Sequence, residues 1–331
     1  MKPIQPIERF RLPNRRNVLR LMGTGLAVAP FLSLARCSSS GTTTSAAGAD
    51  LGVAAGNDLA ASVPWAIGGT ADLSAATKAY NPFSGAVSSC SVPTCSITLG
   101  PCYAPTRVTQ DISDGLAGVP VRFALRLVDD SCNPVTDATV DVWHVMPVGT
   151  YSGESQNLAF CDGSSPSPLE AYQYFRGVRA SDGSGLVDFY SCYPGWYSGR
   201  TIHLHLTIRR GAGDYTTQTE YLTTQLLFDD TITDDIFANA SPYARSTQRD
   251  TNNSNDTTVA ASAVSDYLFD MTKMPDGSLV CAKTIILRAA TSESLCTAPG
   301  GSAGMGGGDG GPPGGGGFPP DGGFGGMPPT G

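Results

Sequence analysis

The chain has few charged residues, and this shortage limits what it can be. Only 15% of its 331 residues are Asp, Glu, Lys or Arg, so it is neither a disordered acidic chain nor a basic nucleic-acid-binding protein. The charge is also unevenly placed. Residues 1–37 hold seven basic residues and one acidic residue, which leaves 14 basic and 28 acidic residues in the remainder. A surface with this acidic excess repels nucleic acid and anionic lipid.

Several sequence patterns are missing as well. The nine cysteines include no CxxC pair, which argues against a cysteine-based metal site. No repeat occurs at solenoid or propeller spacing, and no long apolar run follows residue 37, so we expect no membrane-spanning helix. Glycine and proline are abundant, at 40 and 24 residues, which excludes a helical bundle.

The first 37 residues are typical of an export signal. Arg15 and Arg16 precede an uncharged stretch, residues 21–35, that is too short to span a bilayer comfortably. The paired arginines resemble the twin-arginine type of bacterial signal, and an ordinary basic leader is the alternative. Cys37 ends a lipoprotein-like box that carries an arginine where a small residue is usual, so lipid anchoring stays open. We expect an exported protein, periplasmic or extracellular, in which the other eight cysteines favour disulfides over thiols.

Composition divides the rest of the chain into three parts. Residues 38–63 are Ser, Thr, Gly and Ala with few bulky side chains, which is typical of a linker. Residues 299–331 are mostly Gly and Pro and predict a disordered tail. The folded domain is therefore expected over residues 64–298.

Within this domain the main hydrophobic period is two, which predicts strands. Turn signals such as Asp182-Gly183 and Asp276-Gly277 separate the candidate strands. The expected strands cover residues 119–128, 138–144, 186–190, 200–208 and 278–287. The first of these reads as half-buried, with Arg122 and Arg126 on its polar side. Short helices are expected only around 169–174 and 259–269. The sequence therefore predicts an all-β fold, an antiparallel β-sandwich with long loops.

The strand at 200–208 carries two of the chain's three histidines. Ile202, Leu204, Leu206 and Ile208 alternate with them, so His203 and His205 share the opposite face of the strand. Two imidazoles at this spacing can bind one metal ion, and two polar residues on a solvated face are the alternative interpretation. The third histidine, His144, is expected to be a buried structural hydrogen bonder.

Two tyrosines lie in turn-rich segments near this strand. Tyr197 precedes it, and Tyr151 follows the candidate strand at 138–144. A highly charged ion lowers the pKa of a phenol enough to bind the phenolate. Because anionic oxygen ligands select a hard ion, two phenolates with two imidazoles favour ferric iron over zinc or copper(I).

Several motifs, in one order along the chain, resemble the intradiol ring-cleavage dioxygenases, the family of catechol and protocatechuate dioxygenases. The resemblance covers most of residues 99–288. The motifs that carry it are Gly100-Pro101-Cys102-Tyr103, Trp143-His144 with Gly149-Thr150-Tyr151-Ser152, Pro194-Gly195-Trp196-Tyr197, Arg200-Thr201-Ile202-His203-Leu204-His205, and the strand around Gln225. The export signal and the short gap from Tyr197 to His203 are similar to the secreted branch of the family.

This resemblance implies a function and a set of site residues. The ligands of Fe(III), beside a hydroxide, would be Tyr151, Tyr197, His203 and His205, with Tyr197 and His205 as the axial pair. A small catechol-type aromatic diol would bind the iron and be cleaved by O2 between its hydroxylated carbons to a muconate-type diacid. Arg200 would stabilise negative charge that develops on the ring, and Gln225 would be a hydrogen-bonding residue that supports the ligands or orients the reacting oxygen.

Two other interpretations remain open at this point. One is an exported, non-catalytic β-sandwich that serves as a binding or surface module. The other is a different metalloenzyme, with copper or zinc bound by His203 and His205. The natural substrate, the disulfide pairing and the oligomeric state are not determined by the sequence.

Overall fold

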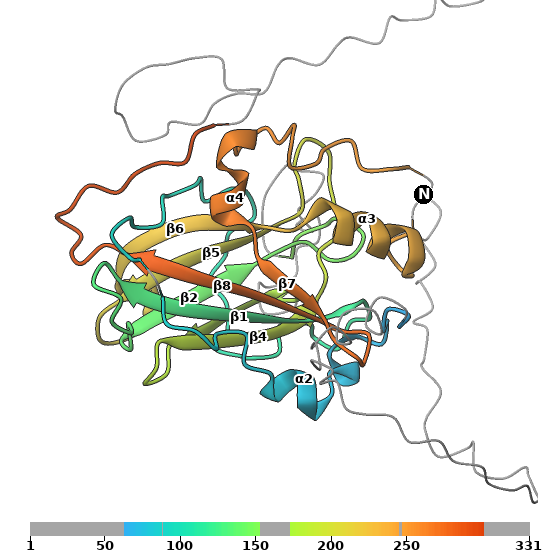
Figure 1. Ribbon diagram of the computed structural model, residues 1–331, viewed down its shortest axis with the longest axis horizontal. Helices are drawn as coiled ribbons and strands as arrows, with labels where there is room; N and C mark the ends of the chain where they lie inside the picture. Colours follow the sequence, from blue (N-terminus) through green and yellow to red (C-terminus); the bar gives the residue numbers. More distant parts are fainter. Residues whose placement is uncertain (1–62, 88, 153–172, 245–246, 301–331) are drawn as a thin grey trace, which may run out of the picture. The chain divides into compact units, whose positions relative to one another are not determined.

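The structure of the protein is a computed structural model that describes residues 63–87, 89–152, 173–244 and 247–300 (Figure 1). The expected export signal, with its Cys37, lies outside the described residues. So do almost all of the expected linker and tail and most of the helix expected around 169–174. Among the described helices, none combines the length and the apolar content needed to cross a bilayer.

Two four-stranded sheets make up the body of the described chain. The first has the order β4-β1-β8-β7, with β1 at Pro120–Asp129, β4 at Leu186–Cys192, β7 at Asp270–Lys273 and β8 at Leu279–Leu287. The second has the order β3-β2-β5-β6, with β2 at Ala138–Trp143, β3 at Arg176–Ala180, β5 at His203–Arg210 and β6 at Thr219–Leu227. The predicted all-β sandwich is confirmed. One pairing departs from the antiparallel expectation, because β1 and β8 run parallel.

The helical elements are short and lie in the connections. They are η1 at Gly69–Asp72, α2 at Ala75–Ala79, η3 at Tyr215–Thr217, α3 at Asp230–Asn239, η4 at Ala261–Ala263 and α4 at Val264–Tyr267. The last two fulfil the expectation of a helix around 259–269. The sequence analysis missed α3, although Asp229 caps its N-terminus by accepting a hydrogen bond from the Ile232 amide.

The main hydrophobic core lies between the two sheets. Strand residues from both sheets meet there, with Phe123, Leu125 and Phe189 from the first sheet and Leu204 and Leu206 from the second, all completely buried. The alternation of side chains along each strand therefore gives one apolar face per sheet, as expected for a sandwich.

The prediction that β1 is half-buried is wrong, because the chain ahead of it covers its second face. Figure 1 shows α2 beneath β1 and β4. Arg122, only 7% exposed, binds Asp188 and also donates to the carbonyl oxygens of Thr77 and Tyr80. Arg122 on the polar side of this strand is thus paired and buried instead of solvated, while Arg126 is partly buried.

Two disulfides are present among the described residues. Cys90 bonds to Cys132, and Cys95 bonds to Cys296. This confirms the expectation of disulfides for these four cysteines.

The same expectation is wrong for Cys192 and Cys281, which are free and buried in the first sheet. Cys192 lies opposite Pro120 at the end of β4, whereas Cys281 pairs with Phe123 in the middle of the sheet. Burial raises the pKa of the Cys192 thiol to about 12 and that of Cys281 well above its usual value. Both thiols are therefore protonated side chains of the packed interior.

Candidate metal centre

Strand β5 turns its two histidines away from the main core. Leu204 and Leu206 are completely buried between the sheets, so His203 and His205 lie on the other face of the strand. That face is not solvated, since His203 is 3% exposed and His205 is 0% exposed. Two buried imidazoles on one strand face need polar or metal partners from elsewhere in the chain.

Two loops supply tyrosines to this face. Tyr151 follows β2, and Tyr197 lies in the turn between β4 and β5. The loops approach closely because residue 195 is a glycine: a Cβ atom on Gly195 would lie 2.2 Å from the carbonyl oxygen of Pro147. This close approach of the two loops places both phenols next to the histidines.

The structure brings the four predicted ligand residues together. Tyr151 Oη lies 2.9 Å from Nε2 of His203 and 2.9 Å from Nε2 of His205. It also lies 3.5 Å from Tyr197 Oη, which in turn is 3.1 Å from Nε2 of His203. Four donor atoms from three separate segments thus share one small volume. Their role as metal ligands stays a prediction.

The hydrogen bond at the far side of the His203 ring determines its tautomer. Nδ1 of His203 lies 2.6 Å from the carbonyl oxygen of Thr201, which can only accept. Nδ1 therefore carries the proton, and the lone pair of Nε2 faces the two phenol oxygens. This is the arrangement in which a histidine binds a metal ion.

His144 is held differently and is not part of this cluster. Its Nδ1 donates to the carbonyl oxygen of Val145, and its Nε2 accepts from the hydroxyl of Ser191, each at 2.7 Å. Burial lowers the pKa of His144 to about 3. The geometry agrees with the expectation of a buried structural hydrogen bonder.

Burial keeps the four cluster side chains neutral in the metal-free protein. It lowers the pKa of His203 and of His205 well below the usual value, with a further decrease from the charge of Arg200. It raises the pKa of Tyr151 well above its usual value and also raises the pKa of Tyr197. The imidazoles are therefore unprotonated at neutral pH, while the phenols need a nearby cation to ionise.

Arg200 and Gln225 lie next to this cluster and bind each other. Arg200 donates from Nη2 to Oε1 of Gln225 at 2.5 Å and from Nε to Oδ2 of Asp256 at 3.1 Å. Gln225 is the cross-strand neighbour of His205 and donates to the carbonyl oxygen of Thr98 at 2.8 Å. Both predicted residues therefore belong to the same buried region as the histidines.

The donor set fits a hard metal ion. Ligand atoms that share one ion through bonds of about 2.0–2.2 Å lie roughly 3 Å apart, which matches the distances among these four atoms. Among the described residues, no three His, Cys, Asp or Glu side chains cluster in a way that would hold a metal. The two imidazoles are instead accompanied by two phenols, and phenolate oxygen selects ferric iron over softer ions.

No family model matches this chain, and no curated protein matches it. Solved structures do match. An intradiol ring-cleavage dioxygenase from Tetranychus urticae is 21% identical, with a TM-score of 0.51, and the match covers 60% of this chain and 95% of that one. The chain has the fold of an intradiol ring-cleavage dioxygenase. The resemblance expected from the sequence motifs is confirmed at the level of the fold.

Two further solved structures are similar at lower scores. The dioxygenase domain of a dioxygenase carbohydrate-binding protein fusion from the cellulolytic bacterium Streptomyces sp. SirexAA-E is 20% identical, covers 60% of this chain and 100% of its own, and has a TM-score of 0.39. The 3-chlorocatechol 1,2-dioxygenase from Rhodococcus opacus 1CP is 18% identical, covers 59% of this chain and 73% of its own, and has a TM-score of 0.38.

Two residues of this intradiol dioxygenase fold were missed by the sequence analysis. Asp256 binds Arg200 from a polar segment that reads as an ordinary surface loop, with no periodic signal to mark it. Gly100 was noted only as part of a motif, yet a Cβ atom there would lie 2.4 Å from Cε1 of His205. Its positive φ of 77° is consistent with a glycine, but its contact with the histidine depends on the fold.

Proposed function

We propose that the protein is an Fe(III)-dependent intradiol dioxygenase that cleaves a catechol-type aromatic diol with O2 to a muconate-type diacid. The observation that carries the proposal is the convergence of Tyr151, Tyr197, His203 and His205. The phenol oxygen of Tyr151 lies 2.9–3.5 Å from the donor atoms of the other three on the buried face of β5. The fold shared with the Tetranychus urticae enzyme supports the same reaction class.

These four side chains would hold the ferric ion. When bound, the ion would supply a positive charge that ionises the phenols and makes a catecholate reactive toward O2. The tautomer of His203, with its proton on Nδ1 and its lone pair on Nε2, is already the metal-binding form.

Tyr197 is the phenol best placed to exchange protons with a substrate. It is partly exposed, whereas Tyr151 is completely buried. As a phenolate, Tyr197 Oη would accept a proton from a hydroxyl of the entering diol, while Tyr151 remains enclosed. This difference in role would follow from exposure, because Tyr197 is the more exposed of the two tyrosines.

Arg200 would stabilise negative charge on the aromatic ring of the substrate. Its guanidinium is held between Asp256 and Gln225, only 8% exposed, so its position is fixed before a substrate binds. A fixed cation in a site with little water stabilises negative charge that develops during a reaction, because no reorganisation is needed. The hydrogen bond from Arg200 also fixes Gln225, whose amide nitrogen is bound to Thr98.

The visible spectrum combined with metal analysis tests this proposal. The purified chain should contain iron, absorb visible light through phenolate-to-iron charge transfer, lose the colour when iron is removed, and consume O2 with catechol. Tyr197→Phe should weaken the colour and the iron binding. Tyr193→Phe is the matched control, because Tyr193 is a buried tyrosine of the same segment whose hydroxyl binds Thr233 instead.

The competing interpretations predict different results. A protein saturated with zinc would be colourless, and a copper protein would contain copper and lack the iron-dependent band. A non-catalytic module would bind no iron and would tolerate Tyr197→Phe. Any of these outcomes would refute the assignment.

A further inference from the structure

We propose that Asp256 is a positioning residue that sets the orientation of both Arg200 and His203 at the candidate metal centre. The part of this inference that concerns turnover rests on the proposed function, whereas the part that concerns His203 does not. Asp256 lies 56 residues after Arg200 in the chain, and its hydrogen bonds go to Arg200, Thr201, Thr258 and Val259, which are not candidate ligands.

The carboxylate of Asp256 is almost fully used by hydrogen bonds. It is 1% exposed. Oδ2 accepts from Nε of Arg200 at 3.1 Å and from the Thr201 amide at 2.7 Å. Oδ1 accepts from the amides of Thr258 and Val259 at 2.7 and 2.8 Å, which fix it to its own loop. A buried carboxylate with this many donors has one orientation, and so do the groups that bind it.

Thr201 connects Asp256 to His203 through two hydrogen bonds. Its amide donates to Asp256, and its carbonyl oxygen accepts from Nδ1 of His203 at 2.6 Å. The Thr201 hydroxyl also donates to Oδ1 of Asn253 at 2.8 Å. The residue that orients the His203 ring is therefore held from two sides by one loop.

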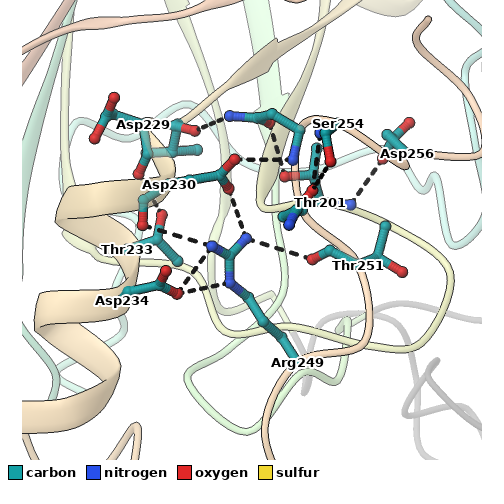
Figure 2. Close-up of polar contacts among 12 residues, drawn as sticks. Thr201, Asp229, Asp230, Thr233, Asp234, Arg249, Thr251, Ser254 and Asp256 are labelled. Atoms are coloured by element: carbon teal, nitrogen blue, oxygen red, sulfur yellow. Dashed lines mark hydrogen bonds and ion pairs between the residues drawn. The ribbon is translucent and has the colours of Figure 1, made fainter. Parts of the chain in front are cut away.

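The loop itself is fastened to the start of α3, as Figure 2 shows. Arg249 binds Asp230 at 2.6 Å and Asp234 at 2.9 Å. The Asn253 amide donates to Asp230 at 3.0 Å, and its side chain donates to the carbonyl oxygen of Phe228 at 2.8 Å. The loop that carries Asp256 is therefore held by bonds to residues outside the cluster.

Two functional groups depend on the same carboxylate. On one side it holds the Arg200 guanidinium against Gln225, and on the other it binds the amide of Thr201, the residue whose carbonyl oxygen orients His203. Removing the charge of Asp256 should therefore disturb the ring of His203 and the cation of Arg200 together. Small misplacements of this kind cost up to about 10²-fold in rate.

The test uses the full-length protein labelled with 15N in its three histidines, without added metal. In the wild type, His203 and His144 should each give a protonated Nδ1 signal in the NMR spectrum, since both donate from Nδ1 to a carbonyl oxygen. Asp256→Asn keeps the shape and removes the charge. We expect it to shift or broaden the His203 signal and to leave the His144 signal in place.

Asp234→Asn is the matched control. Asp234 belongs to the same anchoring network but is largely exposed, and it binds Arg249 rather than Arg200 or Thr201. It should leave the His203 signal unchanged. Loss of the His144 signal in Asp256→Asn would mean that this variant does not fold. Asn253→Ala is then used in its place, because it removes the hydrogen bond between the Thr201 hydroxyl and Asn253.

A kinetic measurement on the iron-loaded protein completes the test. Asp256→Asn should lower kcat by about 10²-fold with a smaller change in KM, because Arg200 acts on charge that develops during the reaction. An unchanged His203 signal in a folded Asp256→Asn protein would overturn the proposal, and so would an unchanged kcat. If the wild type has no dioxygenase activity but the His203 signal responds, the proposed function fails while the positioning role stands.

Discussion

His203 and His205 are held in place by different forces. A hydrogen bond to Thr201 orients His203. Packing orients His205: the indole of Trp143 stacks on its ring at a centroid distance of 4.9 Å and an angle of 5°, and Gly100 lies against its edge. Because packing tolerates little intrusion, the position of His205 depends on the absence of a side chain at residue 100.

Gly100→Ala should therefore impair iron binding. Its Cβ atom would lie 2.4 Å from Cε1 of His205, so the imidazole must move away from the other donors. We expect at least a tenfold loss of iron affinity, measured by titrating the metal-free protein with iron and following the visible band.

Gly115→Ala is the control for backbone strain. Gly100 and Gly115 have φ angles of 77° and 74°, but a Cβ atom at Gly115 would meet no atom within 4 Å. Both variants should lose about 1–2 kcal/mol of stability to the left-handed conformation. Only Gly100→Ala should lose iron, and equal iron binding by the two variants would contradict the role given to the glycine.

At the level of elements, a strand face is buried when another segment of the chain packs over it. Arg122 of β1 and Arg210 of β5 each bind an aspartate through the same pair of contacts, 2.8 Å from Nε and 3.1 Å from Nη2. The Arg122 side chain is 9% exposed, whereas that of Arg210 is 25% exposed and its partner Asp137 is 58% exposed. The difference comes from the segment around α2, which covers β1.

This matched pair predicts unequal effects on stability. Arg122→Met should lower the free energy of unfolding by roughly 3 kcal/mol, because it breaks a largely buried ion pair. It also removes the bonds that hold the carbonyl groups of Thr77 and Tyr80. Arg210→Met should cost about 0–1 kcal/mol, as for other exposed pairs. Urea denaturation measures both, and equal losses would mean that the cover of β1 adds no stability.

At the level of the whole molecule, the disulfides join segments that are distant in the chain. Cys95 and Cys296 are separated by 201 residues, and Cys90 and Cys132 by 42. The Cys95–Cys296 disulfide joins the chain near residue 296 to the segment around residue 95. In this segment the amide of Ile97 donates a hydrogen bond to the carbonyl oxygen of Thr223 in β6. The disulfide therefore connects the last described segment to the sheet that carries the histidines.

Removing either disulfide should lower the free energy of unfolding, and the decrease should be larger for the disulfide that closes the longer loop. Closing these loops lowers the entropy of the unfolded chain, which corresponds to about 5 kcal/mol for Cys95–Cys296 and about 4 kcal/mol for Cys90–Cys132. Alanine at both positions of each pair, followed by denaturation under non-reducing conditions, measures the two losses. A larger loss for the shorter link would mean that native packing around it outweighs loop entropy.

Local sequence determined β1, β2, β4, β5 and β8 and the face on which the histidines lie, but it did not mark β3 and β7. The alternation around Leu204 and Leu206 required His203 and His205 to share a face, and turn residues preceded β4 and β8. The ligand roles of Tyr151 and Tyr197 are implied by the resemblance of their motifs to a known family. The alternation and the turns depend on residues close together in the chain, which is why a linear pattern can predict them.

Tertiary structure alone decided what surrounds those residues. It placed Asp256 against Arg200, Gly100 against His205 and the α2 segment over β1, and it left Cys192 and Cys281 unpaired. Each of these contacts joins segments that are far apart in the chain and carry no shared pattern. Their energies depend on burial and distance, which exist only once the two sheets have packed.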